Sequence, residues 1–252
     1  MPRYKLTLEY DGTDFVGWQR QTNGLSVQQV VEEAITAYCG QACRLHVAGR
    51  TDAGVHALGQ VAHFDGVKDD PPDTVRDAVN FHAKPHAVAI LAAEIVPGEE
   101  AEAPFHARFS ATSRSYVYRI LNRRAPAVLD RGRVWWTPKP LDARAMDRAA
   151  KVLLGKHDFT TFRAAECQAD SPIRTLDRLD VSRAGEEILI HAHARSFLHH
   201  QVRNMVGSLA LVGLGKWGAK DLEQALAAKN RAAGGPTAPA AGLYLERVGY
   251  GV

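Results

Sequence analysis

The sequence lacks the features that mark membrane and secreted proteins. Its 252 residues contain no run of about 18 apolar residues, so no membrane-spanning helix is expected. The start, "MPRYKLTLEYDG", has no apolar core typical of a signal peptide. Three cysteines are an odd number and fit a reducing compartment better than a disulfide framework. These absences predict a cytoplasmic protein that has no membrane partner.

Recognisable cofactor and metal motifs are also missing. "GLGKWG" (213–218) has the spacing of a dinucleotide-binding loop, but it follows a predicted helix rather than a strand. Its lysine is followed by tryptophan, where a P-loop needs serine or threonine. Cys39, Cys43 and His46 lack a second ligand pair at zinc spacing, and the histidines of 191–200 lack a carboxylate or cysteine to complete a set. We therefore expect no cofactor and no metal.

What is present describes a mildly basic globular chain. Hydrophobic residues make up 46% and charged residues 23% of the sequence, with a formal net charge of +3. The length allows one large domain or two small ones. The basic residues gather in "RSYVYRILNRRAPAVLDRGRVWW" (114–136), where arginines alternate with aromatic residues and only one aspartate occurs. Arginine forks bind phosphates and aromatic rings stack on bases, so this mixture suits RNA, although a solvated basic face is the simpler interpretation.

The first part of the chain has a regular order of predicted elements. Ser26, with Gln29 three residues later, forms a capping box at the start of the first predicted helix. Residue periodicity and turn signals predict strands at 3–10, 43–49, 58–65 and 87–95, and helices at 25–40 and 73–81.

The second part repeats this order. The same signals predict strands at 113–121, 173–183, 187–194 and 242–250, and helices at 142–155 and 197–214. Each part is then β-α-β-β-α-β, the ferredoxin-like or split βαβ arrangement. The expected fold class is α+β, with two such halves (1–106 and 107–252) forming a mixed, mainly antiparallel sheet with helices on one face and a cleft between the halves. The stretch 232–242 is expected to be a flexible loop.

The most informative stretch is "AGRTDAGVHALGQVAHF" (48–64). Asp52 lies in it between glycine and alanine residues, whose small size lets a ligand approach the backbone closely. Arg50 would keep that carboxylate ionised, because an opposite charge favours the charged form. An ionised, positioned carboxylate can attack the anomeric carbon of a sugar. The alternative is a hairpin loop joined by an Arg–Asp pair. Glycosidases need a second carboxylate as acid, and this stretch offers none.

Several stretches resemble one known family in order and spacing. They are "YDGTDFVGWQRQ" (10–21), "AGRTDAGVHALGQVAHF", "FHARFSATSRSYVYRILN" (105–122), "LLGKHDFTTFRA" (153–164), "FLHHQVRNMVGSL" (197–209) and "GLYL" (242–245). The chain is identified as resembling the tRNA pseudouridine synthase A family, whose members modify the anticodon stem-loop. The resemblance runs nearly end to end, and "GRTDAGVHA" is its most specific motif.

The resemblance implies roles for individual residues. Asp52 falls on the catalytic nucleophile, and Arg50 on the arginine that pairs with it. Tyr116 falls on the tyrosine that stacks on the target uracil and is a candidate base at C5. Leu243 falls on the leucine that packs on the base from the other side, and Arg203 on an arginine near the aspartate.

The resemblance also implies the reaction and its partners. Uridine at tRNA positions 38 to 40 would be isomerised to pseudouridine without a cofactor, by a homodimer that binds tRNA across both subunits. His56 and Gln60 complete the list of candidate substrate-binding residues. Two other interpretations remain open: a non-catalytic ferredoxin-like RNA-binding protein, and a nucleoside or glycosyl hydrolase that uses Asp52 alone.

Overall fold

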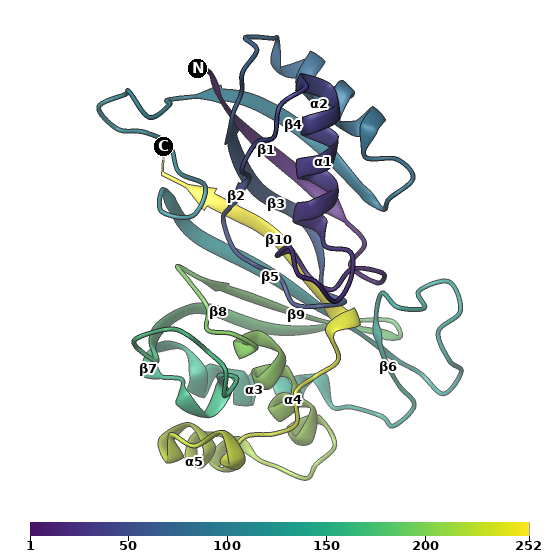
Figure 1. The fold of residues 1–252 in the computed structure, drawn as a ribbon. Helices are drawn as coiled ribbons and strands as arrows, with labels where there is room; N and C mark the ends of the chain where they lie inside the picture. Colours follow the sequence, from purple (N-terminus) through teal and green to yellow (C-terminus); the bar gives the residue numbers. More distant parts are fainter. Residues whose placement is uncertain (252) are drawn as a thin grey trace. The chain divides into compact units, whose positions relative to one another are not determined.

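The computed structural model describes residues 1–251, and contacts within the chain divide it into two compact units. The first unit comprises Met1–Thr112 together with the chain from Leu245 onward, and the second comprises Ser113–Tyr244. Each unit contains both strands and helices, which confirms the α+β class (Figure 1). Within residues 1–251, no helix combines the length and the apolar character needed to cross a bilayer.

The first unit follows the predicted element order. Its elements are β1 (Arg3–Tyr10), α1 (Val27–Cys39), β2 (His46–Val47), β3 (His56–Asp65), α2 (Pro72–His82) and β4 (Val88–Val96), followed at the end of the chain by most of β10 (Leu243–Tyr250). Strand β1 lies between β3 and β4 and is antiparallel to both, and β2 is antiparallel to β3. This is the strand order of a ferredoxin-like unit.

Helix α1 forms where the sequence predicts it. The Ser26 hydroxyl accepts a hydrogen bond from the Gln29 backbone amide at 3.2 Å, and the helix ends at Gly40, which has a left-handed φ of 76°. Its apolar face is buried, and α1 also contacts α2 (Figure 1). The core of this unit includes the fully buried side chains of Leu6, Leu8, Trp18, Val31, Ile35, Ala62 and Val79.

The second unit repeats the order and adds to it. Its elements are β5 (Ala111–Asn122), β6 (Trp135–Thr137), α3 (Ala143–Ala150), β7 (Gly155–Asp158), β8 (Ile173–Ala184), β9 (Glu187–Ala194), α4 (Gln201–Gly213) and α5 (Ala219–Ala228). Strand β9 lies between β5 and β8 and is antiparallel to both, β7 is antiparallel to β8, and β6 is parallel to β5. Helices α3, α4 and α5 pack against one another (Figure 1).

Three elements of the second unit were not predicted: β6, β7 and α5. The two strands have only three and four residues, too few for an alternating pattern. Helix α4 also begins at Gln201 rather than Phe197, because His200 has a left-handed φ of 61° and the residues before it form a turn. The Gln201 side chain accepts a hydrogen bond from the Leu198 amide at 2.9 Å and stabilises that turn.

A buried histidine lies at the far end of β3 from the Asp52 turn. His63 is 1% exposed, and its Nδ1 accepts a hydrogen bond from the Ala107 amide at 3.1 Å. Its ring stacks on that of His46 at 4.9 Å and meets that of His106 at 4.8 Å. Burial, with Arg3 and the two other histidines nearby, lowers the pKa of His63 from 6.5 to about 3.

This shift makes the protein sensitive to acid. Because the folded-state pKa of His63 is depressed, the unfolded chain binds a proton that the folded chain excludes, and stability falls as the pH drops below about 6.5. We expect about 2 kcal/mol less stability from this residue at pH 5 than at pH 8. Urea unfolding of the wild type and of His63→Asn at both pH values measures it. Asparagine keeps an acceptor but does not titrate, so an equal pH dependence in both proteins would contradict the assignment.

Candidate functional site

Asp52 lies in a turn between β2 and β3. The Val55 amide donates to the Asp52 carbonyl at 3.1 Å, which closes a turn over Ala53 and Gly54. Ala53 is exposed, and Asp52 itself is half-buried. The turn therefore presents a carboxylate on backbone that carries almost no side-chain bulk, as the sequence predicts.

The segment after β1 is joined to this turn by two backbone hydrogen bonds. The Trp18 amide donates to the Thr51 carbonyl at 3.0 Å, and the Gly54 amide donates to the Phe15 carbonyl at 3.4 Å. Trp18 and Phe15 are themselves buried in the core of the first unit. On both sides of Asp52 the backbone is therefore hydrogen-bonded to the backbone of a buried aromatic residue.

Two further contacts bring the same segment against the turn. The hydroxyl groups of Tyr10 and Thr51 are hydrogen-bonded at 2.7 Å in a buried environment, and burial raises the pKa of Tyr10 to about 12. Gly12 approaches the turn so closely that a Cβ at this position would lie 2.1 Å from the Val55 carbonyl oxygen. Only glycine fits there. The turn that carries Asp52 is thus held rigidly, which suits a group that must be preorganised.

His56 and Gln60 lie on β3 behind the turn. His56 is 1% exposed, and its Nδ1 accepts a hydrogen bond from the Gly12 amide at 3.0 Å. Gln60 is 0% exposed and donates to the Gly49 carbonyl at 2.8 Å. Both side chains therefore connect β3 to the two segments that form the turn.

Arg50 lies two residues before Asp52, and its side chain is exposed. The backbone on both sides of it is held by hydrogen bonds. Gly49 is hydrogen-bonded to Gln60 and Thr51 to Trp18, so the backbone on both sides of Arg50 is fixed while its own side chain extends into solvent.

Tyr116 lies on β5 in the second unit. It pairs with Ala192 of β9, and its half-buried ring meets the ring of Phe197 edge-on at a centroid distance of 5.2 Å. Phe197 could not be selected from the sequence, because it appears there only as the first residue of a predicted helix. In the structure it lies in the segment just before the turn that leads into α4, with its ring edge-on to that of Tyr116.

Arg203 and Leu243 are connected through the glycine- and proline-rich segment 234–242. Arg203 Nε donates to the Ala238 carbonyl at 2.9 Å, and the Ala238 amide donates back to the Arg203 carbonyl at 3.1 Å. The buried Tyr118 hydroxyl donates to the Pro239 carbonyl at 2.7 Å. Leu243, the first residue of β10, is 6% exposed. The segment is therefore docked on α4 and β5, which corrects the expectation of a flexible loop.

A buried network of polar side chains also holds the segment 234–242 in place. Asn204, 0% exposed, donates to the Phe162 carbonyl at 2.8 Å and accepts from Arg231 at 3.1 Å and from Thr237 at 2.6 Å. Arg231 also donates to the Gly235 carbonyl at 2.9 Å. The sequence does not show these contacts, because a polar side chain on a helix gives no sign of its partners.

The basic stretch 114–136 is partly occupied by internal ion pairs. Arg119 lies 2.6 Å from Glu187, and Arg123 lies 3.0 Å from Glu186. Arg124 and Arg131 are exposed. The predicted basic face is therefore narrower than the count of arginines suggests.

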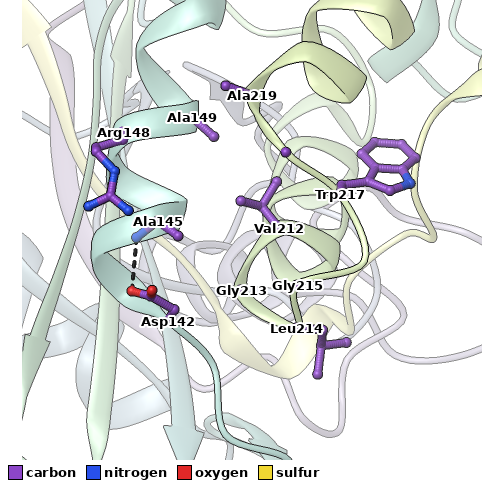
Figure 2. A pocket seen from close by; sticks show the side chains of 11 residues that line it. Asp142, Ala145, Arg148, Ala149, Val212, Gly213, Leu214, Gly215, Trp217 and Ala219 are labelled. Atoms are coloured by element: carbon purple, nitrogen blue, oxygen red, sulfur yellow. Dashed lines mark hydrogen bonds between the residues drawn. The ribbon is translucent and has the colours of Figure 1, made fainter.

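A cavity of about 530 Å³ lies in the second unit, between α3 and the turn that joins α4 to α5 (Figure 2). Its wall is mostly small and apolar, and Asp142, at its edge, accepts a hydrogen bond from the Ala145 amide at 2.9 Å. The seven predicted site residues do not line it. Its position is explained by the glycines of the turn, which leave space beside Val212 and Trp217.

The predicted site residues thus fall into two groups. Arg50, Asp52, His56 and Gln60 share one turn and the strand after it in the first unit, and Tyr116, Arg203 and Leu243 belong to the second unit. The first group offers a rigidly held carboxylate, and the second an aromatic ring, a guanidinium and an apolar side chain. A positioned carboxylate can act on a sugar carbon, and an aromatic ring beside apolar side chains is a surface on which a base can stack.

Comparison with known proteins shows the family to which the chain is similar. A family model described as tRNA pseudouridine synthase matches residues 7–109 and 149–251. The chain is 63% identical over 250 residues to the tRNA pseudouridine synthase A of Paramagnetospirillum magneticum, covering 99% of this chain and 96% of that protein. It is 61% identical to the proteins of the same name from Parvibaculum lavamentivorans and Mesorhizobium japonicum, covering 99% of this chain and 100% of each.

Proposed function

The chain belongs to the tRNA pseudouridine synthase family, and from this premise we propose that it isomerises uridine to pseudouridine at positions 38 to 40 of the tRNA anticodon stem-loop. The observation that carries the proposal is the turn that presents Asp52. It is built from small residues, it is fixed by backbone hydrogen bonds, and it lies within the matched region. A flipped-out nucleotide needs such an open approach to a positioned carboxylate.

Asp52 is the proposed nucleophile. In the isomerisation the N1–C1′ bond of uridine breaks, the uracil turns, and C5 bonds to C1′. C5 then loses its proton, and N1 gains one, so the product has the composition of the substrate. No hydride, phosphate or external water is consumed, and no cofactor is needed. An aspartate that acts on C1′ or assists elimination from the sugar satisfies this balance.

The other residues receive roles that follow from their surroundings. Tyr116 would stack on the uracil and serve as the base at C5, with its ring oriented by Phe197. Leu243 would pack on the opposite face of the base, and Arg203 would bind the phosphate backbone next to it. Arg50, exposed in the free protein, would pair with Asp52 or with a phosphate once RNA is bound.

His56 and Gln60 are proposed to act on the substrate indirectly. Because both side chains are buried and hydrogen-bonded to the backbone of Gly12 and Gly49, in the segments next to the Asp52 turn, they would support the turn rather than contact the nucleotide. We further propose that the protein works as a homodimer in the cytoplasm, with tRNA as its macromolecular substrate. Light scattering on the free protein measures the dimer directly.

The proposal is tested with tRNA that carries tritium at C5 of uridine. The synthase should release one tritium for each uridine modified, without releasing free uracil. Free uracil in proportion to the tritium lost from the RNA would indicate a hydrolase instead. Tight tRNA binding with no release of either kind would indicate a non-catalytic RNA-binding protein.

A further inference from the structure

A second surface of the first unit combines aromatic and basic side chains, of which the arginines and the phenylalanine are exposed and the histidines are half-buried. It consists of Arg44, His46, His106, Arg108 and Phe109, and we call it the Phe109 patch. Phe109 is 75% exposed. Its ring lies 4.4 Å from that of His106, and the Arg108 guanidinium carbon lies 5.7 Å from its centroid.

The turn that carries Phe109 is fixed rather than loose. His106 Nδ1 accepts hydrogen bonds from the amides of Arg108 at 3.1 Å and Phe109 at 3.4 Å. The His106 amide donates to the Ser110 hydroxyl at 2.9 Å, and the Ser110 amide donates to the His106 carbonyl at 2.9 Å. An exposed apolar ring on a rigid turn is already in position for a partner, and binding there costs little ordering of the chain.

The base of the turn is attached to the core. The Ala107 amide donates to the buried His63, and the Ala107 carbonyl accepts from the Tyr250 hydroxyl at 2.7 Å. Ala107 is 0% exposed. Both backbone groups of this residue are therefore used to hold the turn, and Phe109, two residues later, remains outside the core.

The charge around the ring is positive. Arg44 and Arg108 are exposed, and after desolvation Arg44 is the largest cause that lowers the pKa of His46. The nearby acidic groups, Asp65 and Glu99, form ion pairs with the buried Arg3 at 2.8 Å and 2.7 Å. Arg3, Arg44 and Arg108 together carry three positive charges against the two negative charges of Asp65 and Glu99, so the surface next to Phe109 favours an anion.

The patch is too far from Asp52 for one nucleotide to reach both. His46 pairs with His63 on β3, and the Asp52 turn leads into the same strand at His56. Seven residues of extended strand span about 23 Å. A ligand that occupies both places must extend over several nucleotides, as a tRNA does.

We propose that the Phe109 patch is a second tRNA-contact surface, on which an unpaired base stacks on the Phe109 ring while Arg44 and Arg108 bind adjacent phosphates. This inference rests on the proposed function, because it takes tRNA as the substrate. Base stacking on an aromatic ring tolerates any base, and arginines read phosphates without regard to sequence. The patch therefore adds affinity and register rather than sequence specificity.

The test is tRNA affinity, measured by fluorescence anisotropy over a salt series. All variants are made in an Asp52→Asn background so that the RNA is not modified during titration. Phe109→Ala should raise the Kd about ten-fold without changing the salt dependence, and Phe109→Trp should restore affinity. Arg44→Gln and Arg108→Gln should each weaken binding and reduce the log–log salt slope by about 0.7 to 0.9.

Phe81 provides a matched control. It is 69% exposed on α2 and also lies next to a histidine ring, His82 at 5.2 Å, so Phe81→Ala removes a similar surface at another place. Its tRNA affinity should be unchanged. A Phe109→Ala Kd equal to that of Phe81→Ala would overturn the inference, as would a change of oligomeric state with unchanged affinity. Pseudouridine formation by the wild type, measured separately, reports on the proposed function itself.

Discussion

Replacing Asp52 by asparagine is expected to lower the rate of tritium release from C5-labelled tRNA by at least about 10⁴-fold. Asparagine has nearly the same size and can occupy the same turn, but it carries no charge and cannot act as a nucleophile on C1′. The turn itself is closed by the Asp52 carbonyl, which the substitution keeps. We therefore expect thermal stability and tRNA affinity close to those of the wild type, so that the loss is confined to the chemical step.

Asp14→Asn is the control for charge alone. Asp14 is an exposed carboxylate on the segment that packs against the same turn, so this variant removes one negative charge nearby without touching the proposed nucleophile. It should retain activity within a few-fold. Equal release by Asp52→Asn and the wild type would leave a synthase that does not use Asp52, and equal losses in both variants would indicate an effect of local charge.

The sequence predicted the parts of the fold that depend on local patterns. Ser26 identified the start of α1, and the alternating apolar residues of β1 identified a strand with the observed limits. It failed where contacts distant in sequence decide the outcome. The fully buried Asn204 gave no indication of its bonds to Phe162 and Arg231, so the docked segment 234–242 was expected to be flexible.

The candidate site also combines features that the sequence predicts with contacts between residues distant in sequence, which it does not predict. The small residues around Asp52 can be recognised in the sequence, because composition alone shows an open turn. The hydrogen bonds that fix this turn come from Phe15 and Trp18, and no spacing rule connects them to it. Arg50 is close to Asp52 in sequence, which predicts an ion pair, and its side chain is exposed next to backbone that Gln60 holds at Gly49.

The largest expected effect on stability is that of Gly207→Ala. In a helix interior alanine is normally better than glycine by about 1 kcal/mol. Here a Cβ would lie 1.7 Å from the Pro236 carbonyl oxygen and 2.8 Å from its carbon. These are backbone atoms of a segment held by Asn204 and Arg231, so they cannot move cheaply. We expect a net loss of about 2 to 3 kcal/mol and a melting temperature lower by roughly 5 to 10 °C.

The same substitution should reduce activity beyond its effect on folding. Displacing Pro236 moves Ala238, which is bonded to Arg203, and the chain that leads to Leu243. At a temperature where the variant is fully folded, we expect kcat/KM to fall about 100-fold, because small misplacements of binding groups have effects of this size. Steady-state kinetics and differential scanning calorimetry measure the two effects separately.

Gly213→Ala is the matched variant at the end of the same helix. Its Cβ would lie 2.7 Å from the sulfur of the flexible Met146 side chain and 3.2 Å from the Leu141 Cβ, with no backbone atom among its three nearest neighbours. It gains the same helix propensity, so its stability should remain within about 1 kcal/mol of the wild type and its activity should be unchanged. If Gly207→Ala behaved like Gly213→Ala, the account of a docked segment that positions Arg203 and Leu243 would be wrong.

The most direct test of the central claim is to map pseudouridine in tRNA after treatment with the purified protein. Transcripts with a single uridine at position 38, 39 or 40 of the anticodon arm are incubated with the wild type, and the modified base is located by carbodiimide labelling and primer extension. We predict pseudouridine at each of these positions and none elsewhere in the transcripts. Unmodified uridine at all three positions, with a protein that is folded and binds the tRNA, would contradict the account.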